Sequence, residues 1–241
     1  MSGALREVWA YLADSTLFWL AFTVAAYLLA LAAYLRCRGN PLLLPVLTAV
    51  AMVVAVLYGT GTPYEVYAGH TWFLSFLIGP ATVALAIPLY GQLGRLRQMM
   101  VPLCVALLAG SATAIVTGMG IAWMLGGSLQ TQLSVAPKSA TMPIAMEVAA
   151  LAGGLPSLTT IAVAVTGIAG AILAGSLLRL FRIADPAAQG FSLGLSAHAI
   201  GVARAFQASE TAGAFAALGM GLNGIATAVL IPVWLALLAL F

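Results

Sequence analysis

The chain has 241 residues, of which 63% are hydrophobic and only 6% are charged. A soluble domain has about 25% charged residues, so a soluble fold would expose apolar surface that it could not cover. The net charge is only +3 and is spread along the chain, which excludes a nucleic-acid-binding protein. We therefore expect an all-α, polytopic transmembrane protein whose helices contact membrane lipid.

Long runs without Asp, Glu, Lys or Arg mark the expected membrane spans. A helix needs about 20 apolar residues to cross the hydrocarbon core, and these runs lack the alternation of barrel strands. The N-terminus also lacks the basic start and cleavage site of a signal peptide, so the first run is a retained span. The sequence predicts about six full spans, at 17–35, 41–58, 71–90, 99–125, 158–178 and 211–241.

Arginine pairs follow the first, third and fifth of these spans, and the intervening loops 59–70 and 126–137 carry no Lys or Arg. Cytoplasmic loops are enriched in basic residues, so we expect all three pairs in the cytoplasm and the N-terminus outside. Cys37 lies within the first pair, on the reducing side, so no disulfide with Cys104 is expected. The pairs are Arg36 with Arg38, Arg95 with Arg97, and Arg179 with Arg182.

The segment 134–155 is predicted to be a broken or re-entrant helix. If it crossed the membrane fully, the pair that follows the 158–178 span would face the wrong side. Its charges, Lys138 and Glu147, and its two prolines suit a hairpin buried in protein better than a lipid-facing helix. Gly153-Gly154 and Pro156 mark the boundary at which the next helix begins.

The segment 187–207 has the same character, with three glycines and the polar side chains His198 and Arg204. Asp185-Pro186 is typical of a helix start just before it. If this segment also returns to its own side, the two hairpins enter from opposite faces, as in inverted repeats around a midplane site. Lys138-Ser139-Ala140-Thr141 and Leu195-Ser196-Ala197-His198 form a faint repeat that supports this interpretation.

The polar residues of the two broken segments are the candidate site. Ionisable residues within membrane segments usually face protein or water and mark a pathway. The charged residues have structural alternatives: Lys138 snorkels to the surface, Glu147 forms an ion pair with Lys138 or Arg204, and Arg204 lies in a cytoplasmic loop. The polar residues have them too: the hydroxyls of Ser139 and Thr141 bond to the helix backbone, and His198 is a packed, hydrogen-bonded histidine. The candidates for an anion are Thr82, Lys138, Ser139, Thr141, Ser196, His198 and Arg204, and those for a coupling proton or ion are Glu147 and His198.

Two further patterns are set aside. Gly219–Gly224 fits the dinucleotide-binding fingerprint, but no strand precedes it and the surrounding run is a span, so close packing of small residues explains it better. Lys138 and Ser139 are adjacent and would point in different directions on a helix, which disfavours a Ser–Lys nucleophile pair. We expect no enzyme, no cofactor and no metal, with H⁺ or Na⁺ as candidate coupling ions.

Three stretches resemble signatures of the LrgB/CidB family: Phe76–Tyr90, Pro137–Glu147 and Ser196–Ala205. They lie in order at family-like spacing, so 1–241 is expected to be one transmembrane domain, with N-terminal spans in 17–70 and an LrgB-like signature region in 71–241. Met142 and Val202 depart from the family pattern, since relatives often carry hydroxyl residues there.

The resemblance implies a bacterial inner-membrane protein that works beside a smaller LrgA/CidA-type membrane protein. It implies a carrier for small monocarboxylates of the glycolate, glycerate, lactate or pyruvate class, by alternating access. The alternative function that the resemblance implies is that of a holin-like or antiholin-like modulator of murein hydrolase export and autolysis. A homo-oligomer is also expected.

Overall fold

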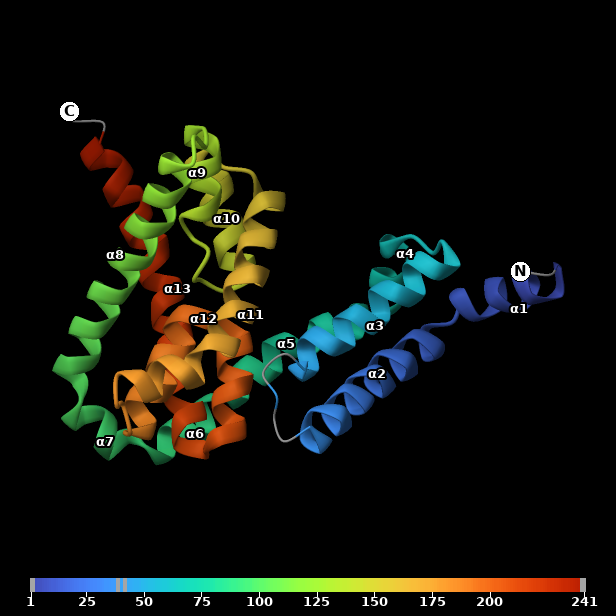
Figure 1. Ribbon diagram of the computed structural model, residues 1–241, viewed down its shortest axis with the longest axis horizontal. Coiled ribbons are helices and arrows are strands. Elements are labelled where there is room, and N and C mark those ends of the chain that lie inside the picture. Colours follow the sequence, from blue (N-terminus) through green and yellow to red (C-terminus); the bar gives the residue numbers. More distant parts are fainter. Residues whose placement is uncertain (1–2, 38–39, 41–42, 239–241) are drawn as a thin grey trace. The chain divides into compact units, whose positions relative to one another are not determined.

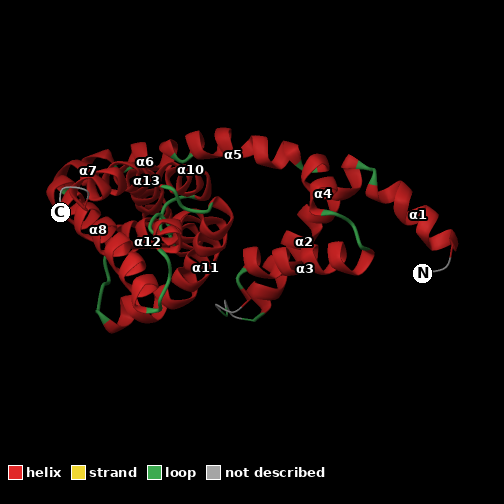
Figure 2. Cartoon of the chain, turned by 90° about the horizontal axis from the view of Figure 1, so that it is seen from above, coloured by secondary structure: helices red, strands yellow, loops and turns green. Residues whose placement is uncertain are grey.

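The computed structural model describes residues 3–37, 40 and 43–238, and every regular element in these residues is a helix (Figure 2). This confirms the all-α prediction. The residues form two compact units, Met1–Ala84 and Leu85–Phe241. The description of 1–241 as one domain stays a prediction, and each unit is described by itself.

Unit 1 is built around two packed helices, α2 and α3. Trp19 of α2 is fully buried and donates its indole N–H to the carbonyl of Ala13 at 2.9 Å. Helix α3 has 16 residues, so the 41–58 span is shorter than predicted and starts later, at Pro45. The helices are α1 (Gly3–Ala13), α2 (Thr16–Arg36), α3 (Pro45–Thr60), α4 (Tyr64–His70) and α5 (Trp72–Ala84).

Among the described residues, five helical segments are long and apolar enough to cross a membrane. Three of them, α8, α11 and α13, belong to unit 2, and the others are α2 and Trp72–Gly91. The predicted break at Gly153-Gly154 and the start at Pro186 are both confirmed. The helices are α6 (Ala86–Gly91), α7 (Leu93–Gln98), α8 (Met100–Met124), α9 (Leu129–Val135), α10 (Met142–Ala152), α11 (Pro156–Leu180), α12 (Pro186–Ala208) and α13 (Glu210–Leu238).

Helices α8 and α11 run in opposite directions, and the segment between them is a hairpin. Arg95, just before α8, pairs with Asp185, just after α11, so α8 starts and α11 ends at the same end of unit 2, here called the arginine end (Figure 1). Helices α9 and α10 therefore start and finish at the far end. The Ser134 hydroxyl, at the end of α9, accepts from the backbone N–H of Leu155 at 2.7 Å, which joins the two limbs.

Helix α12 folds back on itself. His198 has φ +41 and ψ −133, and Ala197 is also non-helical. In a straight helix, residues eight apart are separated by about 12 Å, yet a Cβ on Gly201 would overlap the carbonyl oxygen of Leu193. Helix α12 is thus a second hairpin that enters from the arginine end, and the two hairpins enter from opposite ends as predicted.

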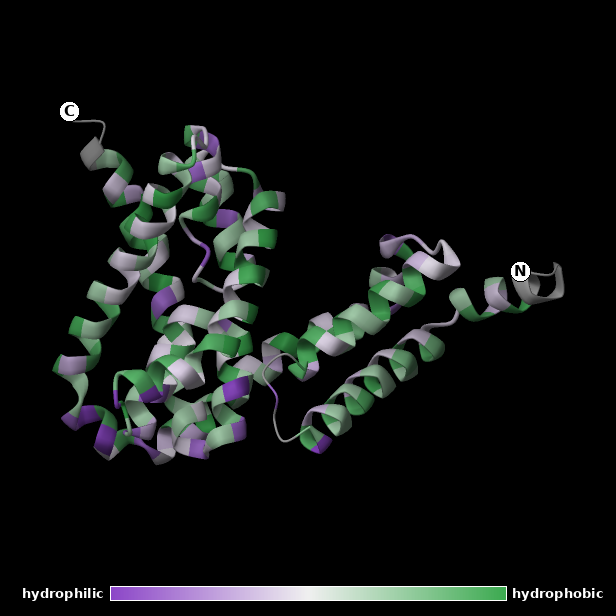
Figure 3. Ribbon diagram, viewed as in Figure 1, coloured by the Kyte–Doolittle hydropathy of each residue, from purple (hydrophilic) through white to green (hydrophobic). Residues whose placement is uncertain are grey.

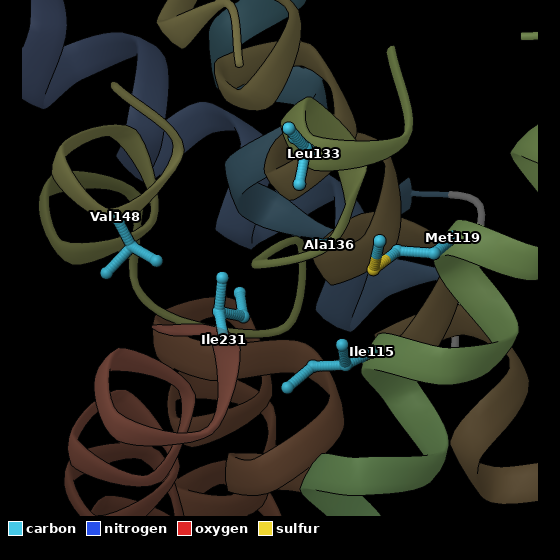
Figure 4. Close-up of a cluster of buried hydrophobic side chains, with 6 residues drawn as sticks. All are labelled: Ile115, Met119, Leu133, Ala136, Val148 and Ile231. Carbon is cyan, nitrogen blue, oxygen red and sulfur yellow. The ribbon is translucent and has the colours of Figure 1, made fainter. Parts of the chain in front are cut away.

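Helix α13 crosses the whole of unit 2. Near its start, Ala212 and Ala216 pack against Leu85 and α12; near its other end, Ile231 packs against α8, α9 and α10. Figure 3 shows the long helices as mainly hydrophobic, with hydrophilic colour gathered around α7 at the arginine end. Figure 4 shows the cluster at the far end, which comprises Ile115, Met119, Leu133, Ala136, Val148 and Ile231.

The packing of α12 on α13 predicts a large effect of added side-chain volume. A Cβ on Gly194 would overlap the carbonyl oxygen of Ala216. We expect Gly194→Val to destabilise the protein by at least about 2 kcal/mol, measured as thermal unfolding in detergent. Gly221→Val is the control: its Cβ meets nothing within 4 Å, so its effect should stay within about 0.5 kcal/mol. Equal effects of the two variants would contradict this packing.

The hairpin arrangement predicts which residues share a side of the membrane. In a chain with Cys37 and Cys104 replaced by Ser, impermeant thiol reagents should label Arg182→Cys and Glu210→Cys from one side. Gln130→Cys and Ser157→Cys should be labelled from the opposite side only. Labelling of residues 182 and 210 from different sides would mean that α12 crosses the membrane fully.

Candidate functional site

The first break, residues 136–141, brings Lys138 to the middle of α8. The ammonium Nζ donates to the carbonyl oxygen of Ala114 at 2.7 Å. Gly118 lies one helical turn beyond Ala114, and a Cβ on it would lie only 2.8 Å from Nζ. The missing side chain at Gly118 therefore leaves the Ala114 carbonyl accessible to a second hydrogen bond, which the lysine makes.

The second break places His198 against α11 in the same way. The ring nitrogen Nε2 lies 2.9 Å from the carbonyl oxygen of Val163. Gly167, again four residues further along the helix, has no side chain where the imidazole ring packs. His198 is 5% exposed, so it is both a packed histidine, as the structural alternative held, and part of a break.

The two halves of unit 2 thus repeat one arrangement in opposite directions. A long helix, α8 or α11, is followed by a hairpin whose break returns an ionisable side chain to that same helix. In both cases the acceptor is a backbone carbonyl four residues before a glycine. Both breaks carry the related tetrapeptides Lys138–Thr141 and Leu195–His198.

Asn223 of α13 joins the two breaks. Its amide nitrogen Nδ2 donates to the carbonyl of Ser139 at 2.9 Å and to that of Leu195 at 3.0 Å. Its Oδ1 accepts from the hydroxyl of Ser111 in α8 at 2.7 Å. Asn223 is fully buried and Ser111 is 1% exposed. Since both lie near the middle of their long helices, this polar centre lies at mid-depth in unit 2.

A cleft of about 470 Å³ leads to Lys138. Gly127 and Thr131 line it at the far end of unit 2, and Gly118 lines it near Lys138. An ammonium group has three N–H donors, and one of them binds Ala114. A small anion that enters this cleft would meet an ammonium at mid-depth.

The other predicted residues are divided between this centre and other places. Ser139 is buried at the first break and Thr141 is the residue before α10; within the part of the chain that the structure describes, neither hydroxyl makes a hydrogen bond. Ser196 is exposed and its hydroxyl donates to Ser192 of its own helix. Thr82 belongs to unit 1 and donates to the carbonyl of Ile78. The hydroxyls of Thr82 and Ser196 are thus both bonded to the backbone of their own helices.

Arg204 and Glu147 lie away from the breaks. Arg204 is in the returning half of α12, where Nη1 donates to Gln207 at 3.2 Å. Glu147 is exposed on α10 and lines a groove with residues of α13. The alternative that pairs Glu147 with Lys138 or Arg204 is wrong, because no such ion pair is present among the described residues.

Four residues of the centre were missed: Asn223, Ser111, Gly118 and Gly167. Asn223 lay inside the glycine pattern that was attributed to helix packing. An amide within a charge-free span was the available signal, because a polar side chain at that depth needs partners. The two glycines carried no such signal, since small residues are frequent throughout these helices.

The fold and the centre define a multi-pass membrane protein with two opposed re-entrant hairpins. A family model described as the LrgB-like family matches residues 23–237, so the chain belongs to the LrgB-like family. No solved structure matches it.

Three relatives are bacterial proteins. YxaC of Bacillus subtilis (strain 168) is 38% identical over 204 residues, which cover 84% of this chain and 88% of YxaC. YwbG of the same strain is 37% identical over 185 residues, 76% and 81% of the two chains. A protein of Bacillus mycoides (strain KBAB4) that is named antiholin-like protein LrgB is 29% identical over 218 residues, 90% and 95% of the two chains.

The role of Asn223 predicts a specific loss of stability. Asn223→Ala removes three buried hydrogen bonds and leaves two carbonyls and a hydroxyl without their partner. We expect a loss of about 2 kcal/mol, measured as thermal unfolding in detergent. Ser196→Ala removes one hydrogen bond within its own exposed helix and should cost less than about 0.5 kcal/mol. An unchanged stability of Asn223→Ala would contradict the bridge.

Proposed function

We propose that the protein is a membrane carrier for small monocarboxylates of the glycolate, glycerate, lactate or pyruvate class, which works by alternating access. The observation that carries the proposal is the ammonium of Lys138 at the inner end of a cleft, at mid-depth in unit 2. A cation at this depth is costly without a partner, and an anionic substrate would neutralise it during transport.

The helix ends at the two breaks favour the same substrate. Helix α10 begins just after Thr141, and the returning half of α12 begins just after His198. Helix N-termini carry partial positive charge and unpaired N–H groups, so both favour a carboxylate. Lys138 supplies the countercharge, and the hydroxyls of Ser139 and Thr141 are available for the other oxygens of a hydroxy acid or keto acid.

His198 is the proposed site of the coupling proton. Its ring lies at the second break, and the backbone of that break is tied to the first through Asn223. Protonation of the imidazole can therefore respond to occupancy at the first break. Ser196, Arg204 and Glu147 have no place in this proposal, because they lie on an exposed helix face, beyond the second break and in a separate groove, respectively. Thr82 is left out because its hydroxyl donates to the backbone of its own helix.

The proposed setting is the bacterial cytoplasmic membrane, with the arginine end of unit 2 in the cytoplasm and the N-terminus outside. Arg95, Arg97, Arg179 and Arg182 lie at this end, in agreement with the excess of basic residues in cytoplasmic loops. The cleft at Lys138 then opens to the outside. A smaller LrgA-type membrane protein and further copies of this chain are the proposed partners.

Transport assays in proteoliposomes test the site. We expect Lys138→Ala to reduce uptake of glycolate or pyruvate at least about tenfold at low substrate concentration, because it removes the countercharge. His198→Ala should abolish uptake driven by a proton gradient while it spares counterflow exchange. Ser196→Ala is the control and should retain wild-type uptake. Wild-type rates for both Lys138→Ala and His198→Ala would contradict the site.

The second candidate function is that of an antiholin-like modulator of lysis, which the name of the Bacillus mycoides relative favours. It predicts no saturable solute flux and tolerance of polar substitution at Lys138. Saturable uptake that depends on Lys138 therefore separates the two functions.

A further inference from the structure

A groove of about 360 Å³ lies between α10 and α13, away from the site described above. Its walls are apolar, with Ile144 and Leu151 on α10 and Ile231 and Leu235 on α13, and Glu147 is its one ionisable side chain. Glu147 is exposed, and among the described residues it makes no hydrogen bond or ion pair.

The depth of Glu147 makes this exposure costly. It lies five residues into α10, so about 8 Å along the helix from the first break, which is at mid-depth in unit 2. The hydrocarbon core extends about 15 Å from its centre. With mid-depth in unit 2 placed at the bilayer centre, and in the orientation proposed above, the carboxylate lies in the outer half of the hydrocarbon core, where an unpaired charge is strongly disfavoured.

The groove holds a second acceptor that lacks its regular partner. Pro232 of α13 has no N–H, so it cannot bond to the carbonyl four residues earlier, that of Ala228. Both residues line the groove with Glu147. The surface thus offers a carboxylate and a backbone carbonyl within apolar walls, and its complement is an apolar helix with a side chain that donates several hydrogen bonds.

We propose that this groove docks a transmembrane helix of a different membrane protein, through a lysine or arginine at the level of Glu147. Among the residues whose side chains the structure describes, a second copy of this chain offers no lysine or arginine at that level. The charge-free spans contain no cation, Lys138 binds α8 beside its own cleft, and Arg204 lies toward the opposite end. The groove shares no lining residue with the cleft at Lys138, so the docking proposal can be tested independently of the transport function.

Energy transfer in proteoliposomes tests the docking surface. The full chain, with Cys37 and Cys104 replaced by Ser, carries a donor dye at Ser157→Cys. The probes are two synthetic Leu-Ala transmembrane helices of about 22 residues, each with an acceptor dye. They differ at one position in the outer half, which is Lys in one helix and Leu in the other. We expect the Lys helix to bind about tenfold more tightly than the Leu helix, and Glu147→Gln to remove this preference.

A relocated carboxylate is the matched control. Ile161 of α11 is 62% exposed and, like Glu147, lies about 8 Å along its helix from one end. The double variant Glu147→Gln, Ile161→Glu should not regain the preference, whereas Glu147→Lys should prefer a helix with Glu at the probe position. Equal binding of the Lys and Leu helices to the wild type, or a preference regained through Ile161→Glu, would overturn the proposal. Self-association of the wild type that Glu147→Gln abolishes would do so too.

Discussion

The carboxamide of Asn223 is the interaction on which the arrangement of unit 2 depends. Two interrupted helices meet at mid-depth, where no water satisfies freed backbone groups and each unsatisfied one is costly. Asn223 donates to one carbonyl from each break, at Ser139 and Leu195, and Ser111 fixes the amide from the other side. One side chain on a continuous helix thus sets the positions of both breaks.

The interruptions and their opposite entry could be predicted from the sequence because their signals are local. Prolines, glycines and charges interrupt apolar runs, and the arginine pairs fix on which side each run must end. The Asn223 bridge could not be predicted, since its partners lie 84 and 28 residues away in the chain. The alternative in which Glu147 pairs with Lys138 is not realised, because Lys138 lies in a non-helical break and bonds to α8, whereas Glu147 lies on the exposed side of α10.

The glycines of α8 and α11 explain how an ionisable side chain can be kept at this depth. A helix carbonyl already accepts one bond from within its helix, but it has a second lone pair. Where the residue one turn later lacks a side chain, a long or bulky group from another segment has room to reach that lone pair. Gly118 and Gly167 provide this access to Ala114 and Val163, and the same solution in both halves accounts for the hairpins docking on the helices that precede them.

The bridge and the two carbonyl contacts differ in what they constrain. Asn223 binds a backbone carbonyl of each break, so the two breaks must stay together whenever its three hydrogen bonds are intact. The bonds of Lys138 and His198 hold side chains, each to a different long helix, and either can be exchanged for a ligand without disturbing the bridge. A carboxylate that draws Lys138 from α8 would therefore remove one contact of α8 with the centre, while Ser111 still holds α8 to Asn223 and α11 remains attached through His198. The centre can therefore accept an anion at Lys138 without losing the backbone contacts by which Asn223 positions the two breaks.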